Sequence, residues 1–158
     1  GAAIEEHDRP APGGPDGEPL ADLVVRSSSL TGIDLSPVDV ASAIDEIPVL
    51  CLAAAAARGT TRIRGVGELR HKESDRVAGI ADGLTALGAA IRVEGDDIVV
   101  EGGRRLTGAV TETLDDHRLA MTFAVAGLIA EGETVVLRPG SAAISYPGFF
   151  RELEGVRA

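Results

Sequence analysis

The sequence predicts an α/β protein in which helices pack on sheets, and three observations favour this class. Predicted helices and strands alternate along the 158 residues. Apolar residues make up 44% of the chain and are mainly Ala, Val, Leu and Ile, with few aromatic side chains. Small residues of this kind let helices and sheets approach closely. The third observation is an internal repeat, and the chain is long enough for one ordinary domain.

The first half of the chain contains two predicted strands and two predicted helices. A loop rich in Pro and Gly, residues 7–19, precedes a strand over residues 23–28, where apolar and β-branched residues concentrate. Residues 46–58 are almost all apolar, which predicts a buried helix, and a strand follows over residues 60–66. In residues 74–87 the apolar side chains recur at helical spacing, which predicts an amphipathic helix closed by a glycine.

The second half continues this alternation. Residues 89–102 predict a hairpin that turns at Gly95. A third long helix is predicted over residues 117–131, again closed by a glycine. Residues 134–140 form the last predicted strand, and residues 147–156 form a final helix with a proline in its first turn.

Charge and composition exclude several classes of function. The formal net charge is −10 at pH 7, whereas a surface for nucleic acid or an anionic membrane needs a basic face. A local basic cluster outweighs distant charges at short range, so a small anionic ligand stays compatible with this charge. The single cysteine, Cys51, provides no disulfide frame and no metal-ligand spacing, and its apolar surroundings favour core packing. Without a long apolar run or a signal pattern, we expect a cytoplasmic protein.

Three segments recur in the same order along the chain, which indicates an internal repeat. The offsets between the copies are 87, 76 and 73 residues, and they shorten because the first copy carries the longer Pro/Gly loop. The paired segments are GAAI (1–4 and 88–91), LTG (30–32 and 106–108) and a helix-Gly-strand run (52–63 and 124–136).

From the repeat we predict a single partial domain over residues 1–158, with repeats at about 1–87 and 88–158. Gly88 closes a predicted helix, so Gly1 in the equivalent place predicts that the chain begins in mid-repeat. The chain would then be a piece of a longer protein and lack a preceding helix and strand. The alternative is a chance similarity between two alanine-rich segments.

The repeat also predicts where an anion binds. Under the 73-residue offset, the helix at 46–58 corresponds to the helix at 117–131, so packing about a pseudo-symmetry axis brings several helix N-termini together. Helix N-termini present free N–H groups and positive partial charge, which suit phosphate or carboxylate. Lys72, Arg76 and Arg118 add full charges there. Lys72 and Arg76 are four residues apart and share one face if the helix extends back to Lys72.

Lys72 is the only lysine among the 15 basic residues of the chain. It lies in the run L-R-H-K-E-S-D-R-V, residues 69–77. Arginine holds planar carboxylates and phosphates through paired hydrogen bonds. Lysine is instead a compact point charge that fits between two anions and exchanges a proton when desolvated. The single exception therefore indicates a special role at this position.

Four separated motifs resemble one family of enzymes, the 5-enolpyruvylshikimate-3-phosphate synthases. The motifs are D-E-I-P (45–48), L-R-x-K-E-S-D-R (69–76), D-H-R-L-A-M (116–121) and S-Y-P-G-F-F (145–150), in order through nearly the whole chain. The resemblance implies an inside-out α/β enolpyruvyl transferase fold, with helices buried in the middle, built from repeated βαβαββ units. About two units of the C-terminal domain are then present, and the N-terminal domain, which completes the active site, is absent.

The resemblance implies an activity as well as a fold. The family transfers the enolpyruvyl group of phosphoenolpyruvate to the 5-hydroxyl of shikimate 3-phosphate and releases phosphate. This is a step of the shikimate pathway to chorismate and the aromatic amino acids. Both substrates and the missing domain are therefore the expected partners, and no metal or organic cofactor is called for. A fragment alone is expected to be inactive.

The resemblance also implies a role for each motif residue. Asp45 is the candidate general base on the 5-hydroxyl, and Glu73 is the candidate acid and base at the phosphoenolpyruvate methylene. Lys72 is expected to contact both substrates. Arg76 and Arg118 are expected to bind the phosphoenolpyruvate anion.

Each role has a plainer structural alternative. Asp45 is also a suitable N-cap for the helix that follows. Glu73 and Asp75 are suited to complement the N-terminus of the next helix. For Arg118 the alternative is a solvated position on a helix. For Lys72 it is a surface charge without a function.

Other classes of function stay open at this stage. A UDP-N-acetylglucosamine enolpyruvyl transferase shares the fold and chemistry, and a non-catalytic anion-binding module keeps the fold alone. His71 and His117 suit structural or exposed positions better than catalytic ones. At Ile144 many members of the family carry a lysine, so the chain follows the branch that lacks this cation.

Overall fold

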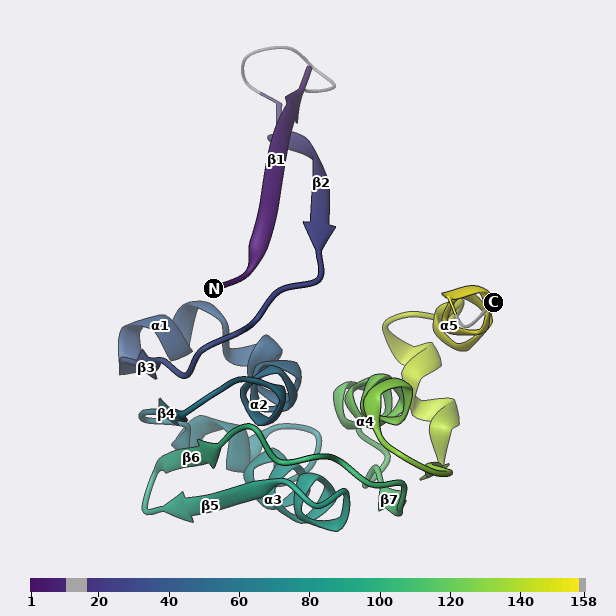
Figure 1. The fold of residues 1–158 in the computed structure, drawn as a ribbon. Helices are drawn as coiled ribbons and strands as arrows, with labels where there is room; N and C mark the ends of the chain where they lie inside the picture. The colour runs from purple at the N-terminus through teal and green to yellow at the C-terminus, as the bar shows by residue number, and fades with distance from the viewer. Residues whose placement is uncertain (11–16, 157–158) are drawn as a thin grey trace. The chain divides into compact units, whose positions relative to one another are not determined.

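The computed structural model of the chain describes residues 1–10 and 17–156. These residues belong to two compact units, which divide after Leu30 (Figure 1). In the first unit, β1 (Ala3–Arg9) pairs with β2 (Leu20–Arg26) in an antiparallel hairpin. The strand predicted from residue 23 therefore begins three residues earlier. The loop predicted over residues 7–19 is wrong for residues 7–9, because these residues belong to β1 and pair with β2. Residues 11–16 of this predicted loop lie outside the described part of the chain.

The second unit contains a four-stranded sheet in the order β3-β4-β6-β5. Its strands are β3 (Asp34–Leu35), β4 (Thr60–Ile63), β5 (Ala90–Glu94) and β6 (Asp97–Glu101). β3 and β4 are parallel, and the other neighbours are antiparallel. The predicted hairpin turn at Gly95 is confirmed, and the backbone of this residue is left-handed with φ 63°, a conformation that glycine adopts without strain.

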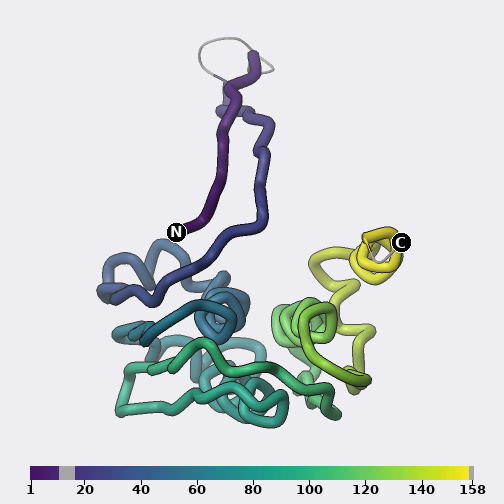
Figure 2. The backbone as a smooth tube through the Cα atoms, viewed as in Figure 1, coloured from purple at the N-terminus to yellow at the C-terminus, as the bar shows by residue number. Residues whose placement is uncertain are grey.

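Helices connect these strands. α2 (Ile47–Ala56) lies between β3 and β4, and α3 (Arg76–Ala86) lies between β4 and β5. The resulting order β3-α2-β4-α3-β5-β6 is one βαβαββ unit, which can be followed along the tube in Figure 2. The predicted α/β class and the predicted βαβαββ unit are therefore observed within residues 31–101.

β3 and the short helix α1 (Pro37–Ser42) were not predicted from the sequence. The Ser36 hydroxyl accepts from Asp39 N, and the Asp39 carboxylate accepts from Ser36 N in return. Such a reciprocal capping box is visible in the sequence as Ser-Pro-x-Asp, so this helix start was predictable.

A second βαβ segment follows the first unit. β7 (Val110–Glu112) is parallel to β8 (Val135–Leu137), and α4 (His117–Ile129) connects them. A 3₁₀ helix, η4 (Pro139–Ile144), and α5 (Phe149–Val156) end the described chain.

Two predictions for this segment are wrong in extent. The strand expected over 134–140 ends at Leu137, because the backbone of Arg138 is left-handed with φ 51° and η4 begins directly after it. The final helix begins at Phe149, so Pro147 precedes its first turn.

The three long helices form the interior of the second unit. α2, α3 and α4 contact one another and are seen nearly end-on in Figure 1. α2 is buried along most of its length, at Ile47, Pro48, Cys51, Leu52, Ala54 and Ala55. A helix that is apolar on all sides belongs in a core. None of the helices among the described residues combines the length and apolar character needed to cross a membrane.

Two glycines set the distance between α3 and α4. A Cβ atom on Gly79 would lie 2.5 Å from Leu119 Cδ1, and one on Gly83 would lie 2.1 Å from Phe123 Cζ. Leu119 and Phe123 are both fully buried. The glycines therefore provide the space that these two side chains fill.

The two LTG segments make the same contacts. Thr31 forms a parallel bridge with Arg58, and Thr107 forms one with Glu131. The amide nitrogens of the following glycines, Gly32 and Gly108, each lie 2.7 Å from the carbonyl oxygen of the bridge partner. This parallel supports the predicted repeat, whose boundaries stay a prediction.

Candidate functional site

The N-terminal ends of α2, α3 and α4 meet at one place. Arg76 is the first residue of α3, Asp116 is the N-cap of α4, and Asp45 lies in the 3₁₀ turn Ile44–Glu46 directly before α2. Arg76 hydrogen-bonds to both Asp45 and Asp116. The predicted convergence of helix N-termini is therefore confirmed for these three helices.

Arg76 is the centre of this cluster. Its side chain is only 1% exposed, and it donates to three carboxylates. The distances are 2.7 Å from Nε to Asp116, 3.0 Å from Nη1 to Asp45 and 2.6 Å from Nη2 to Glu73. Burial lowers the pKa of Arg76, but the bonds and charges of Asp116, Glu73 and Asp45 outweigh it and raise the pKa above its ordinary value. The guanidinium is therefore held in its charged form.

Asp45 joins the two arginines that the sequence analysis singled out. Its Oδ1 lies 3.0 Å from Arg76 Nη1, and its Oδ2 lies 3.0 Å from Arg118 Nη2. Arg118 Nη1 also donates to the Asp45 carbonyl oxygen at 3.0 Å. The alternative role of Asp45 as a helix N-cap is wrong, because Glu46 is the N-cap of α2 and no side chain caps this helix.

The start of α3 differs from its prediction. Asp75 is the N-cap and accepts from Ala78 N, so α3 begins at Arg76 and not at Ser74. Lys72 follows the 3₁₀ helix η3 (Gly67–His71) with an extended backbone. The helix does not extend back to Lys72, so the condition for a common helical face of Lys72 and Arg76 is not met. Lys72 is exposed and takes part in none of the ion pairs among residues 1–10 and 17–156.

A small cavity of about 200 Å³ adjoins the cluster. It is lined by residues of the 3₁₀ turn before α2, of α2 itself, and of α4 and α5: Asp45, Glu46, Val49, Arg118, Met121, Thr122, Val125 and Phe149. Arg118 Nε is buried and lacks a hydrogen-bond partner within the described part of the chain. A buried donor without a partner is costly, so Arg118 Nε is an unsatisfied hydrogen-bond donor on a residue that lines this cavity.

One central residue had no predicted role. Asp116 is 0% exposed and bonds to Arg76, yet from the sequence it was named only as the first residue of the D-H-R-L-A-M motif. Its position directly before a predicted helix is the pattern of an N-cap, which was a usable signal. His71 is exposed and His117 is buried in the first turn of α4. Burial raises the pKa of Cys51 to about 12, as its core position predicts.

The charges of the cluster limit its chemistry. Asp45, Glu73 and Asp116 surround Arg76, and Glu46 lies 3.9 Å from Arg118. Two guanidinium groups thus face four carboxylates. An anionic ligand must displace a carboxylate or arrive with further cations. Asp45 and Glu73 are 41% and 51% exposed, so these two of the three carboxylates that pair with Arg76 are in contact with solvent.

Comparison with solved structures defines the class of protein. EPSP synthase from Acinetobacter baumannii matches 98% of this chain with a TM-score of 0.87 and 37% sequence identity, over 36% of its own chain. The enolpyruvyl transferase NikO from Streptomyces tendae matches 85% of this chain with a TM-score of 0.65 and 22% identity, over 30% of its own chain. The fold is therefore that of an enolpyruvyl transferase.

Sequence comparison then defines the family. The family model of EPSP synthase, or 3-phosphoshikimate 1-carboxyvinyltransferase, matches residues 15–153, so the chain belongs to this family. The 3-phosphoshikimate 1-carboxyvinyltransferase of Roseiflexus sp. is 51% identical over 139 residues, 88% of this chain and 32% of the relative. The enzyme of the same name from Gloeobacter violaceus is 50% identical over 141 residues, which cover 89% of this chain and 33% of that relative. The chain spans about a third of the length of these curated relatives.

Proposed function

We propose that the chain is the C-terminal part of a 3-phosphoshikimate 1-carboxyvinyltransferase. The complete enzyme transfers the enolpyruvyl group of phosphoenolpyruvate to the 5-hydroxyl of shikimate 3-phosphate, in the cytoplasmic route to chorismate and the aromatic amino acids. One observation carries the proposal: Asp45, Glu73, Arg76 and Arg118, from three separate motifs, form one connected cluster.

Arg76 and Arg118 are the proposed ligands of the phosphoenolpyruvate anion. Arginine pairs with planar carboxylates and phosphates through two parallel bonds and stays charged throughout. A guanidinium carries more N–H groups than the three that Arg76 uses here, and Arg118 Nε is unpartnered among the described residues. Both arginines therefore keep donors for a ligand.

Asp45 and Glu73 are the proposed proton-transfer groups. Enolpyruvyl transfer protonates C3 of phosphoenolpyruvate while the alcohol attacks C2, and phosphate then leaves from the tetrahedral adduct. Asp45 accepts the hydroxyl proton, and Glu73 exchanges the proton at C3. Both carboxylates are partly exposed at the edge of the cluster. Proton transfer of this kind contributes about 10²–10⁴ in rate.

Lys72 is the proposed contact to both substrates, although it lies outside the helix that carries Arg76. It is exposed, and its charge is free for two anions that approach from solvent. Since carboxylates outnumber arginines in the cluster, further cations are needed to hold two anionic substrates. We assign these to the N-terminal domain of the complete enzyme, which is also why we expect the chain alone to turn nothing over.

Complementation tests the proposal. The chain is mixed with a separately produced N-terminal portion of the Roseiflexus relative, and phosphate release from phosphoenolpyruvate is measured with shikimate 3-phosphate. We expect release from the mixture and none from either part alone. The same assay with UDP-N-acetylglucosamine as acceptor is the matched comparison.

The outcomes separate the alternatives. Activity with UDP-N-acetylglucosamine but not with shikimate 3-phosphate would show that the proposed substrate is wrong. A mixture that assembles, binds phosphoenolpyruvate and releases no phosphate with either acceptor would favour a non-catalytic anion-binding module.

A further inference from the structure

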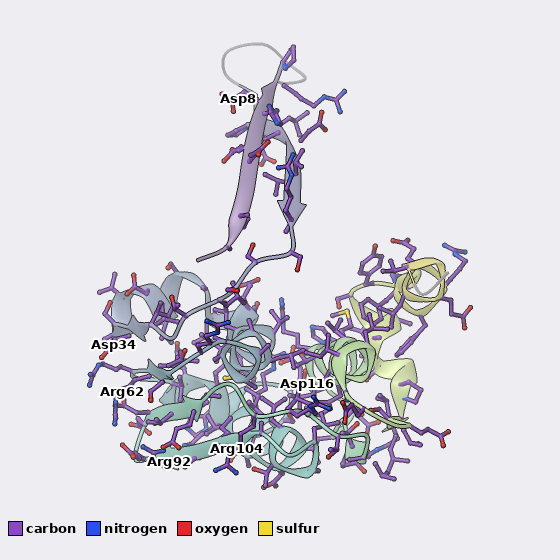
Figure 3. All side chains as sticks on the ribbon, viewed as in Figure 1. Asp8, Asp34, Arg62, Arg92, Arg104 and Asp116 are labelled. Carbon is purple, nitrogen blue, oxygen red and sulfur yellow. The ribbon has the colours of Figure 1, made fainter. Side chains whose placement is uncertain are left out.

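The carboxylate of Asp116 connects the two helices that carry the proposed anion ligands. Its Oδ2 accepts from Arg76 Nε at 2.7 Å and from the Ser74 hydroxyl at 3.1 Å. Its Oδ1 accepts from the backbone N–H of Arg118 at 2.9 Å and from that of Leu119 at 3.4 Å. One side chain thus anchors a guanidinium at the start of α3 and caps α4. Figure 3 shows Asp116 at the start of α4.

Asp116 differs from the other two partners of Arg76 in its burial. Its side chain is 0% exposed, whereas Asp45 and Glu73 are exposed at the edge of the cluster. A fully buried carboxylate with four donors has no freedom to rotate away. The exposed carboxylates are therefore the exchangeable partners of Arg76, and Asp116 is the fixed one.

The contact between Asp116 and Nε orients the whole guanidinium of Arg76. The group is planar, so holding Nε sets the direction in which Nη1 and Nη2 point. Those two nitrogens face the exposed carboxylates, Asp45 and Glu73, at 3.0 and 2.6 Å. An anion that replaces either carboxylate meets nitrogens that are already in place, which lowers the ordering cost of binding.

The backbone directly before Asp116 makes a sharp turn that places this residue at the N-terminus of α4. Leu114 and Asp115 both have left-handed backbones, with φ 54° and 58°. Such angles are uncommon for residues with a side chain and cost energy. They turn the chain sharply after β7, and Asp116 N then donates to the Thr113 carbonyl oxygen at 2.8 Å. Asp115 itself is exposed and pairs with Arg138 on the surface.

We propose that Asp116 is a positioning residue for phosphoenolpyruvate binding: it fixes the plane of the Arg76 guanidinium and the first turn of the helix that carries Arg118, without touching the ligand. This role rests on the proposed function of the two arginines.

The substitution Asp116→Asn separates positioning from helix capping. Asparagine and aspartate are equally good N-caps, so a residue that only caps α4 tolerates this change. The neutral amide cannot accept from Arg118 N and from Arg76 Nε with the strength of a carboxylate. Asp115→Asn is the matched control, since it changes the neighbouring acid, which contacts neither arginine of the site.

Two measurements are made on each variant. The first is the KM for phosphoenolpyruvate in the complemented mixture with shikimate 3-phosphate. The second is the ¹⁵N-detected Nε–H signal of Arg76 in the chain, assigned by its loss in Arg76→Lys. For Asp116→Asn we expect KM to rise by about 10- to 100-fold and the Arg76 signal to broaden through solvent exchange. Asp115→Asn should match the wild type in both.

The proposal is overturned if folded Asp116→Asn keeps the wild-type KM, or if its Arg76 signal is unchanged. Should this variant fail to fold, Ser74→Ala replaces it, because the change removes only one donor to Oδ2. A wild-type KM in Ser74→Ala, with an unchanged Arg76 signal, then overturns the proposal. If the wild-type mixture releases no phosphate, the proposed function fails, and the Arg76 signal alone decides whether Asp116 positions the guanidinium.

Discussion

The carboxylate of Asp45 lies 3.0 Å from the guanidinium of Arg118, although 73 residues separate the two. This separation equals one offset of the predicted repeat, although Asp45 precedes α2 whereas Arg118 is the second residue of α4. Asp45 pairs with both arginines that we assign to phosphoenolpyruvate. The proposed base is therefore an ion-pair partner of both proposed anion ligands.

Asp45→Asn should separate binding from catalysis. Without the carboxylate, the complemented mixture should lose about 10²–10⁴ in kcat, because the 5-hydroxyl loses its proton acceptor. Phosphoenolpyruvate should bind at least as tightly as to the wild type, since a competing negative charge is gone. Steady-state kinetics and a binding titration measure the two effects. Glu46→Gln is the control, because Glu46 lies 3.9 Å from Arg118 and should leave kcat near its wild-type value. An unchanged kcat in Asp45→Asn would refute its role as the base.

Lys72→Arg should lower activity without affecting stability. The substitution keeps the charge but replaces a compact ammonium with a larger, planar fork that does not fit between two anions. The complemented activity should fall by at least about tenfold, whereas the thermal midpoint of the chain should stay the same because Lys72 is exposed. Arg104→Lys, the reverse exchange at another exposed position, should change neither quantity. Full activity in Lys72→Arg would mean that the single lysine has no special function.

Gly83→Ala should destabilise the chain even though alanine favours helices. The added methyl group would meet the Phe123 ring at 2.1 Å in the contact between α3 and α4. Overpacking of this kind costs about 1–3 kcal/mol, more than the helix propensity returns. Gly155→Ala is the matched control, because its Cβ would have no neighbour within 4 Å in α5. Denaturant unfolding should show a lower free energy for Gly83→Ala only, and equal stability of both variants would contradict the close packing.

The Asp116 carboxyl should make the stability of the chain depend on pH in the acidic range. Burial raises the pKa of Asp116, but the Arg76 hydrogen bond and charge outweigh it and leave the pKa below the ordinary value of 3.8. A group whose pKa is lowered by folding stabilises the folded state above its unfolded pKa, and this contribution is lost as pH falls through the folded pKa. Asp116→Asn should be less stable than the wild type by about 1.5–3 kcal/mol near neutral pH. The difference should shrink below a pH of about 4. A difference that is constant over this range would contradict the assigned charge state.

The sequence predicted most of the elements but not all of their ends. The long helices α2, α3 and α4 and the hairpin at Gly95 follow from hydrophobic period and glycine position, which are local signals. β3 has two residues and depends on pairing with β4, so no local pattern reveals it. The start of α3 was placed too early because Asp75, and not Ser74, accepts from the first turn.

The candidate site was predictable as a set of residues, and its connections were not. The motifs supplied Asp45, Glu73, Arg76 and Arg118, and the repeat predicted that helix N-termini meet. The central position of Arg76 and its bond to Asp116 depend on how α3 and α4 pack, which sequence spacing does not contain.

A titration of the chain with phosphoenolpyruvate, followed through the Nε–H signals of its arginines, tests the central claim most directly. We predict that the signals of Arg76 and Arg118 shift together in a weak, saturable way, while that of Arg104 stays in place and no phosphate is released. Saturable binding that leaves both Arg76 and Arg118 unshifted would contradict the claim that these two residues form the anion site.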